Sequence, residues 1–407
     1  MESERKSFNS SLDSFSRKLY NQLVNLNPTQ NLICSPLSIQ TCVGMLRMGA
    51  EDDSDTAKEL DEGLSFSSNK ATEIANSFNN VLAAYKHYSV VKMANKMYLM
   101  KNYEALKEFH DTLTEKFHSE AERIDFSANN EAAATINEWV ESRTNNLITN
   151  LISPNMLDQN TRLVLINAIH FKGEWIDKFD ENETRIEDFH LENESRVRVS
   201  MMNASNKYYY ANLPELDAKV LRLPYRNTNL FMLFVLPNIY TGLKQLEKKL
   251  QTVTLDDITR KLVSRKVFVK LPKFKTEYSQ ELTPIFKELN IKKIFNSQAE
   301  LPKMLVVNES IEVSHIIHKA FIEVNEEGTE AAAATAAVMV LRSLPAHDPE
   351  PQTFHADHPF FYTIYDLNHG CLFMGKLGLP EGTIITDNKK LLNVLCMCVC
   401  VCELQLL

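Results

Sequence analysis

Two pairs of histidines have a spacing that could support metal chemistry. His315 and His318 are three residues apart, as are His355 and His358. On a helix this step places two imidazoles on one face, where they could bind a metal ion. Both pairs, however, lie beside strand-like apolar runs, and in a strand a three-residue step points the two side chains to opposite faces. We therefore expect no metal site, and no other cofactor is indicated.

The sequence also lacks the short motifs of common enzyme classes. It contains no G-x-S-x-G, H-E-x-x-H or C-x-x-C, the motifs of serine hydrolases, zinc proteases and thiol redox sites. Its ten glycines form no G-x-G-x-x-G. A G-x-x-x-x-G from Gly44 to Gly49 is followed by Ala50 and Glu51, and a second one, from Gly370 to Gly375, by Lys376 and Leu377, so neither is followed by Lys and Ser or Thr. Dinucleotide-binding and phosphate-loop enzymes are therefore not favoured, and we expect that the protein is not an enzyme.

The charge balance bears on the class of partner. The 407 residues carry 44 basic and 53 acidic side chains, so the net charge is −9. No general affinity for nucleic acid is expected of such an acidic chain. The basic run 260–275 could indicate a polyanion site. Its alternation with apolar residues such as Val267 and Val269, however, is typical of a strand with one solvated face.

The cysteines and the N-terminus bear on the compartment. Cys34, Cys42 and Cys371 are scattered among apolar residues, as small buried side chains are, whereas four cysteines alternate between Cys396 and Cys402. The first residues contain no apolar stretch and so do not form a secretory signal. We expect a cytoplasmic protein as the chain is written. It would be extracellular if an isoform carried a signal or export were unconventional; no membrane association is expected.

The elements that would position a site are predicted from periodicity. Apolar residues at three- and four-residue steps predict helices at 12–26, 106–117 and 136–148. Nearly continuous apolar runs predict strands buried on both faces. These runs are 163–169, 230–236, 267–271, 360–365 and 371–377. Because no Gly/Ser-rich or Pro-rich linker and no repeat divides the chain, we expect an α+β fold in one body.

The alanine-rich segment from Glu326 to Ser343 has two possible structures. As a helix it could be capped by Thr329. As a strand it places uncharged, mostly small residues on one face and Glu330 on the other. The uncharged face consists of Thr329, Ala331, Ala333, Thr335, Ala337 and Met339. Such a face suits a segment that enters a packed interior, where an unpaired charge is costly. The segment alone does not decide between the two.

The residues around this segment resemble those of the serpin family of serine protease inhibitors. The stretch 318–332, H-K-A-F-I-E-V-N-E-E-G-T-E-A-A, is similar to the family's hinge signature almost letter for letter. The resemblance covers the chain from about Leu12 to Pro380 and includes seven further motifs in the expected order. These are N-L-I-C-S-P-L-S-I (31–39), I-N-E-W-V (136–140), L-I-N-A-I-H-F-K-G-E-W (165–175), L-P-Y (223–225), L-P-K-F (271–274), D-H-P-F (357–360) and F-M-G-K (373–376).

The resemblance implies the organisation of the chain. A serpin domain is expected over 1–380, with a helix-rich N-terminal part, a large central mixed β-sheet, smaller sheets and an exposed reactive-centre loop at about 326–356. The Cys-rich tail 381–407 is expected to lie outside this fold. The chain departs from the family in this tail and in a slightly long stretch between Ser343 and Asp357.

The resemblance also implies roles for the alanine-rich segment. In the family it is a loop that offers one bond to a protease, and a count of seventeen residues from Glu326 implies that this bond is Arg342–Ser343. A trypsin-like protease pairs a guanidinium with the carboxylate of its specificity pocket, so Arg342 implies a trypsin-like target. Alternatively, Arg342 is a solvated loop residue. The implied hinge residues are Glu326, Gly328, Thr329, Glu330, Ala331, Ala332, Ala333, Ala334 and Thr335.

The mechanism implied by the resemblance is inhibition by a suicide substrate. A protease serine would be acylated at Arg342, and the cut loop would insert from Thr329 onward as an extra strand of the large sheet. The native state would then be kinetically trapped, and the inhibitor would act as a monomer that ends in a covalent acyl complex. The alternative is a non-inhibitory serpin that acts as a carrier or chaperone. Such relatives usually place charged or bulky residues on the face where this chain has alanine and threonine.

Further residues match family positions at the large sheet. The polar cluster called the shutter lies beneath it, where hydrogen bonds can exchange as strands part. Its matches are Ser35, Ser38, Asn167 and His318. Trp175 matches the region called the breach, near the start of the loop. His318 could equally be an ordinary core histidine, and Trp175 could equally serve core packing alone.

Overall fold

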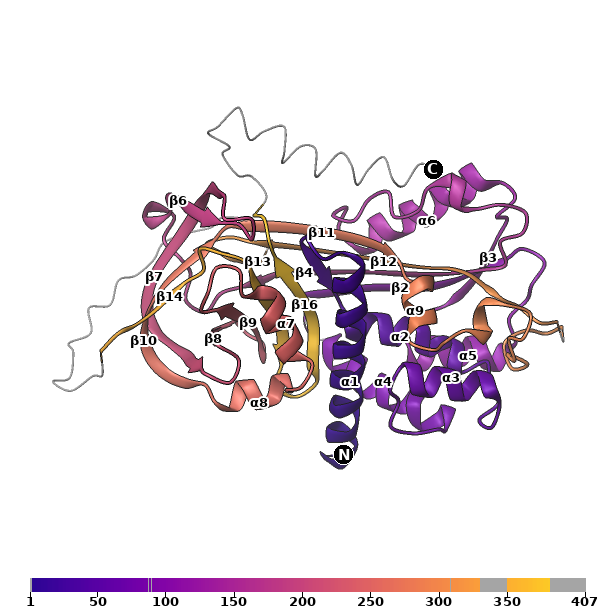
Figure 1. Cartoon of the computed structure of the whole chain (residues 1–407). Helices are drawn as coiled ribbons and strands as arrows, with labels where there is room; N and C mark the ends of the chain where they lie inside the picture. Colours follow the sequence, from indigo (N-terminus) through magenta and orange to yellow (C-terminus); the bar gives the residue numbers. More distant parts are fainter. Residues whose placement is uncertain (1, 87, 89, 308, 330–349, 381–407) are drawn as a thin grey trace.

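Two β-sheets and nine α-helices make up the part of the chain that the structure describes (Figure 1). The structure is a computed structural model, and it describes residues 2–86, 88, 90–307, 309–329 and 350–380. Helices α2 to α5 gather below one end of the central sheet, and the second sheet curls at its other end (Figure 1). The expected α+β fold with a helix-rich N-terminal part is confirmed. The α-helices are α1 (Glu2–Leu26), α2 (Pro36–Arg47), α3 (Asp55–Gly63), α4 (Ala71–Tyr85), α5 (Lys107–Lys116), α6 (Asn129–Arg143), α7 (Leu243–Leu250), α8 (Leu255–Arg260) and α9 (Thr283–Glu288).

The central sheet is mixed, and its middle is a parallel pair of strands. Its order is β3-β2-β4-β12-β13-β5, and β11 pairs with the other edge of β12. Strands β4 and β12 run parallel and pair from Leu163 opposite Val313 to His170 opposite Phe321, with a register shift between Val313 and His315. All nine residues of β4 are buried, as expected of a strand covered on both faces. The strands are β2 (Val91–Met100), β3 (Ala121–Ile124), β4 (Leu163–Phe171), β5 (Gly173–Glu174), β11 (Phe274–Glu281), β12 (Val313–Val324) and β13 (Gly328–Thr329).

The second sheet is mostly antiparallel and has the order β1-β16-β15-β9-β8-β7-β10-β14, with β6 paired to β7. Its last strand, β14, pairs in parallel with β10. This strand is the first described element after the alanine-rich segment, so the second sheet anchors the far end of that segment. The strands are β1 (Leu32–Cys34), β6 (Arg185–His190), β7 (Arg196–Leu213), β8 (Ala218–Pro224), β9 (Leu230–Pro237), β10 (Val263–Pro272), β14 (Gln352–His355), β15 (Phe360–Asp366) and β16 (Gly370–Leu377).

Helix α2 lies in the interior, in contact with β4 of the central sheet and β16 of the second. All twelve of its residues are buried. Ser35 caps it, because its Oγ accepts a hydrogen bond from the Ser38 amide at 3.3 Å, and Pro36 occupies the first turn. Proline is tolerated there because the first amides of a helix have no intrahelical partner. The cap therefore places Ser38 directly beneath the central sheet, whereas Ser35 lies against β16 of the second sheet.

Most of the predicted elements are confirmed. All five apolar runs lie in strands, namely β4, β9, β10, β15 and β16, and the helices predicted at 12–26 and 106–117 correspond to α1 and α5. The helix predicted at 136–148 is wrong at its C-terminal end, because α6 ends at Arg143. Asn145 and Asn146 follow with φ of 54° and 61°, a left-handed conformation that commonly ends a helix. The prediction that the three scattered cysteines are buried and unpaired is also confirmed.

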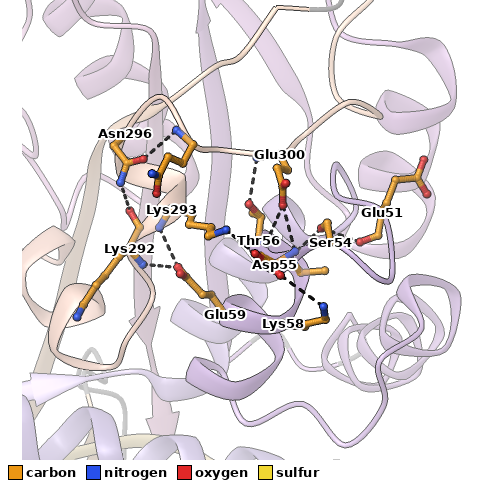
Figure 2. Close-up of polar contacts among 12 residues, drawn as sticks. Glu51, Ser54, Asp55, Thr56, Lys58, Glu59, Lys292, Lys293, Asn296 and Glu300 are labelled. Atoms are coloured by element: carbon orange, nitrogen blue, oxygen red, sulfur yellow. Dashed lines mark hydrogen bonds and ion pairs between the residues drawn. The ribbon is translucent and has the colours of Figure 1, made fainter.

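A distant segment of the chain caps helix α3 (Figure 2). Glu300 Oε2 accepts hydrogen bonds from the amides of Asp55 at 3.1 Å and Thr56 at 3.3 Å, and Thr56 Oγ1 accepts one from the Glu300 amide at 3.0 Å. In return, Glu59 Oε2 accepts from the amides of residues 292–293 at 2.7 and 2.8 Å. These reciprocal bonds satisfy helix-end amides and tie α3 to the segment that leads into β12.

Loss of this cap is expected to lower stability. Replacing Glu300 with alanine removes the acceptor of two helix amides. The free energy of unfolding in the first thermal transition should therefore fall by about 1 kcal/mol. Glu300→Gln keeps one acceptor oxygen without the charge and should lose less. Calorimetry at one fixed scan rate tests this, and equal midpoints for wild type and Glu300→Ala would contradict it.

Candidate functional site

The start of the alanine-rich segment forms a tight turn between β12 and β13. Asn325 Oδ1 accepts hydrogen bonds from the amides of Glu327 at 3.0 Å and Gly328 at 3.2 Å, and the Asn325 amide donates to the Gly328 carbonyl at 2.9 Å. Thr329 follows in β13 and is fully buried. Thr329 is therefore a strand residue, whereas the residues that would form a helix after it lie outside the described ones.

Strand β13 occupies a defined place between two other strands. Thr329 pairs antiparallel with Val324 of β12 on one side and with Gly173 of β5 on the other. Strand β5 follows β4 directly in the chain, after one residue. Thus β13 lies between β12 and the continuation of β4, where these two parallel neighbours separate. An ideal Cβ on Gly328 would lie 2.0 Å from the carbonyl oxygen of Gly173, so this close approach requires glycine.

Glu326 is held by two polar side chains although it is buried. Its carboxylate accepts a hydrogen bond from Thr184 Oγ1 at 2.7 Å and forms an ion pair with Lys273 Nζ at 2.7 Å. Burial opposes ionisation, but these two partners outweigh it and lower the pKa of Glu326 below its ordinary value. The charge therefore fixes the turn at the end of β12 instead of destabilising it.

Trp175 lies beside this turn, as the family resemblance implied. Its indole Nε1 donates to the Asn325 carbonyl at 3.0 Å, and its amide donates to the Glu327 carbonyl at 3.0 Å. Its ring stacks on Tyr225, with 4.6 Å between centroids. The Tyr225 hydroxyl lies 2.5 Å from Thr329 Oγ1. Tyr225 was not singled out from the sequence, although its L-P-Y motif at the end of β8 could have indicated it.

Three of the four predicted shutter residues meet beneath the seam between β4 and β12. Asn167 of β4 lies opposite His318 of β12, and Asn167 Oδ1 is 2.5 Å from His318 Nδ1. Asn167 Nδ2 donates to Ser38 Oγ at 2.6 Å. Ser35 does not join them directly. It caps α2 and donates to the Leu372 carbonyl of β16 at 2.6 Å.

Asn95 completes the cluster and was missed in the sequence. It lies on β2 directly opposite Asn167, and its Oδ1 accepts hydrogen bonds from Ser38 Oγ at 3.2 Å and from Asn167 Nδ2. Three neighbouring strands thus contribute one polar side chain each to a single row. Only the register of β2 against β4 brings Asn95 there, and no local sequence motif carries that information.

His318 is neutral in this cluster. Burial lowers the pKa of His318 from 6.5 to about 3, since a charged imidazole would lose its hydration inside the protein. Asn167 Oδ1 is an acceptor, so Nδ1 is the nitrogen that carries the proton. Its Nε2 is buried and has no partner among the described atoms. His315, the other member of the pair, is only partly buried on the same strand.

The remaining residues of the predicted site follow Thr329 in the chain. Glu330 to Thr335 of the hinge and the Arg342–Ser343 bond lie outside the described residues, as do the cysteines of the tail. Within the described ranges, no cluster of three or more His, Cys, Asp or Glu side chains could hold a metal ion. In the same ranges, no helix is long and apolar enough to cross a membrane.

Comparison with known proteins identifies the family. The model of the family described as "Serpin (serine protease inhibitor)" matches residues 10–380. The chain belongs to the serpin family. Alaserpin of Manduca sexta is 38% identical to this serpin over 379 residues, which are 92% of this chain and 95% of that protein. Antitrypsin of Bombyx mori is 36% identical, over 86% of this chain and 89% of that protein.

Solved serpin structures share the fold. A structure of cleaved Serpin 42Da has a TM-score of 0.85 and 44% identity, and the match covers 93% of this chain and all of that one. Uncleaved ovalbumin has a TM-score of 0.80 and 26% identity, with 92% of this chain and all of that chain covered. The resemblance drawn from the motifs is therefore confirmed for the whole matched region of this serpin.

Acid is expected to lower the free energy of unfolding of this serpin because of His318. In an unfolded chain the pKa of the imidazole is near 6.5, whereas in the native state it is about 3. Between these values the unfolded state binds the extra proton, so native stability falls as the pH drops below 6.5. The slope from this one group approaches about 1.4 kcal/mol per pH unit.

Thermal midpoints measured between pH 7 and pH 5 test this contribution. The midpoint of His318→Gln should fall less with acid than that of the wild type, because the substituted side chain takes up no proton. His315→Gln, on the same strand, is the matched control and should keep the wild-type slope. Equal slopes for all three proteins would contradict the assignment.

Proposed function

We propose that this serpin inhibits trypsin-like serine proteases as a single-use substrate that is acylated at Arg342. The protease serine Oγ attacks the Arg342 carbonyl carbon and forms an ester, the Arg342–Ser343 peptide bond breaks, and the released amine of Ser343 takes up a proton. The segment up to Arg342 then inserts into the central sheet and carries the attached protease with it. The relatives named alaserpin and antitrypsin support a protease-inhibitor function.

The position of β13 carries this proposal. Gly328 and Thr329 already lie antiparallel to β12 and to β5, the continuation of β4. A longer strand that continued β13 between β4 and β12 would keep this orientation. It would replace one parallel ladder with two antiparallel ladders, which are slightly more stable per residue. Insertion therefore gains backbone hydrogen bonds without a change in the direction of any strand.

The residues that follow β13 in the sequence suit a strand inserted between β4 and β12. Thr329 is buried, with its hydroxyl against Tyr225. In a continued strand, alternate residues would share the inward face with Thr329. These residues are Ala331, Ala333, Thr335 and Ala337. All are small and uncharged, so the interior could accept them without an unpaired charge.

A stable covalent complex with trypsin is the first expected result. Mixed with trypsin and run on a denaturing gel, the wild type should form a band at the summed mass that survives detergent. Arg342→Ala removes the guanidinium that fills the specificity pocket, so the rate of complex formation should fall at least about 100-fold. Clean cleavage after Arg342 without a complex would contradict inhibition and favour a carrier or chaperone.

A charge on the inward face should convert the inhibitor into a substrate. Thr329→Arg and Ala333→Arg place a guanidinium where the inserted strand meets the interior, so the protease should deacylate before insertion is complete. Both variants should be cleaved with little complex on the gel. Glu330→Arg, on the opposite face of the strand, is the matched control and should still form the complex. Full inhibition by Ala333→Arg would exclude insertion as the mechanism.

A further inference from the structure

The turn that follows β14 contains the second histidine of the pair His355 and His358. His358 is buried, and both of its ring nitrogens lie within hydrogen-bond distance of an acceptor. Its Nδ1 is 2.8 Å from Asp357 Oδ1, and its Nε2 is 2.7 Å from the carbonyl oxygen of Pro237, the last residue of β9. His355 lies on the other side of the same carboxylate, with 3.7 Å from its Nδ1 to Asp357 Oδ2.

These contacts determine how many protons the His358 ring carries. A carbonyl oxygen only accepts hydrogen bonds, so Nε2 donates to Pro237. Burial opposes the ionisation of Asp357, but its hydrogen bond with His358 and the charges near it outweigh burial and lower the pKa of Asp357. An ionised carboxylate also only accepts, so Nδ1 donates as well. With a proton on each nitrogen, the His358 ring is an imidazolium.

His355 is neutral, by contrast, and does not compete for Asp357. Burial lowers the pKa of His355 below its ordinary value, and its Nε2 makes no hydrogen bond within the described part of the chain. Glu187 Oε2 lies 3.5 Å from that nitrogen, but the Glu187 carboxylate is bound by Lys270 at 2.7 and 2.8 Å. The charge of Asp357 is therefore balanced by His358.

Tyr240 covers the ion pair from the outside. Its ring crosses the His358 ring at 70°, with 5.0 Å between centroids, and stacks on the ring of His190, with 4.1 Å between centroids. Tyr240 is 48% exposed, whereas His358 beneath it is only 4% exposed. The aromatic ring thus separates the two charges from water, which strengthens their attraction.

The same turn joins β14 to three other strands. The Ala356 amide donates to the Lys270 carbonyl of β10 at 2.9 Å, and the His190 amide of β6 donates to the Asp357 carbonyl at 2.7 Å. The His358 ring adds the bond to β9. Strand β14 itself has only four residues and lies at the edge of the second sheet, beside β10 (Figure 1). So short an edge strand has few ladder bonds, and the contacts of the turn therefore contribute much of its attachment.

We propose that the His358–Asp357 ion pair is a proton-dependent latch that keeps β14, the far anchor of the alanine-rich segment, on the second sheet. The closed latch holds one more proton than an open turn with a neutral ring, so acid favours the closed latch and alkali opens it. This sign is opposite to that of His318, which is neutral in the native state. The far end of the segment is therefore held most firmly at mildly acidic pH.

Hydrogen–deuterium exchange of the full chain at pH 6.5 and pH 8.5 tests the latch, after correction for the pH dependence of chemical exchange. The protection of the β14 amides should fall at pH 8.5, whereas that of β15 should not. His358→Gln should lower β14 protection at pH 6.5 about ten-fold, as expected when a charge-assisted hydrogen bond is lost, and should remove the pH dependence. His358→Lys keeps a positive charge between the two acceptors and should keep β14 protected at both pH values.

His369→Gln is the matched control. His369 also lies beside a carboxylate, with 3.3 Å from its Nδ1 to Asp366 Oδ2, but it belongs to the turn between β15 and β16. This variant should keep the wild-type behaviour of β14. Three results would overturn the latch: equal β14 protection of the wild type at both pH values, an unchanged pH dependence in His358→Gln, or equally low protection in His358→Lys and His358→Gln.

The protonation of the ring can also be observed directly. In a sample labelled with ¹⁵N-histidine, the signals that disappear in His358→Gln belong to His358. At pH 7 they should be those of a ring with a proton on both nitrogens. A neutral His358 ring at this pH would overturn the latch.

One consequence of the latch rests on the proposed function. If β14 leaves the sheet, the uncleaved segment gains length at its far end and can enter the seam between β4 and β12. Stored wild type should therefore lose its ability to form the covalent complex with trypsin faster at pH 8.5 than at pH 6.5, and His358→Lys should slow this loss. If no complex forms at either pH, the proposed function fails, whereas the exchange and ring measurements still decide on the latch.

Discussion

The direct pairing of β4 with β12 is the constraint on which the rest of the structure depends. These parallel neighbours form one ladder from 163 to 170 and from 313 to 321, with a register shift only between Val313 and His315, so the strands satisfy each other's backbone groups along most of the seam. Beyond this ladder the two strands separate, and β13 lies between their ends. A strand can enter the seam only if this ladder opens. The side chains beneath and beside the ladder therefore govern whether it can open.

Those groups are polar where an ordinary core would be apolar. Asn95, Asn167 and His318 form a row across three strands, and Ser38 closes it from the end of α2. Such hydrogen bonds can be exchanged for others as strands move, whereas a well-packed apolar core resists any displacement. The cost is a buried imidazole with one unpartnered nitrogen. Because burial disfavours the charged form of this imidazole, we expect acid to lower the stability of the native state.

The ends of the alanine-rich segment differ in how they are held. The first end is fixed by the buried Thr329, by the Glu326–Lys273 ion pair and by the stacked rings of Trp175 and Tyr225. The second end is held by the four-residue strand β14 at the edge of the second sheet.

The sequence by itself determined the family and the apolar strands, because both are encoded in contiguous motifs or in local periodicity. It could not decide whether Thr329 belongs to a helix or a strand, since alanine-rich segments satisfy both patterns. Nor could it find Asn95, Tyr225 or the capping carboxylate of Glu300. Each of these acts through a partner at least 72 residues away. Strand register and the packing of distant elements create those contacts, and a register shift of one residue would turn Asn95 to the other face of the sheet.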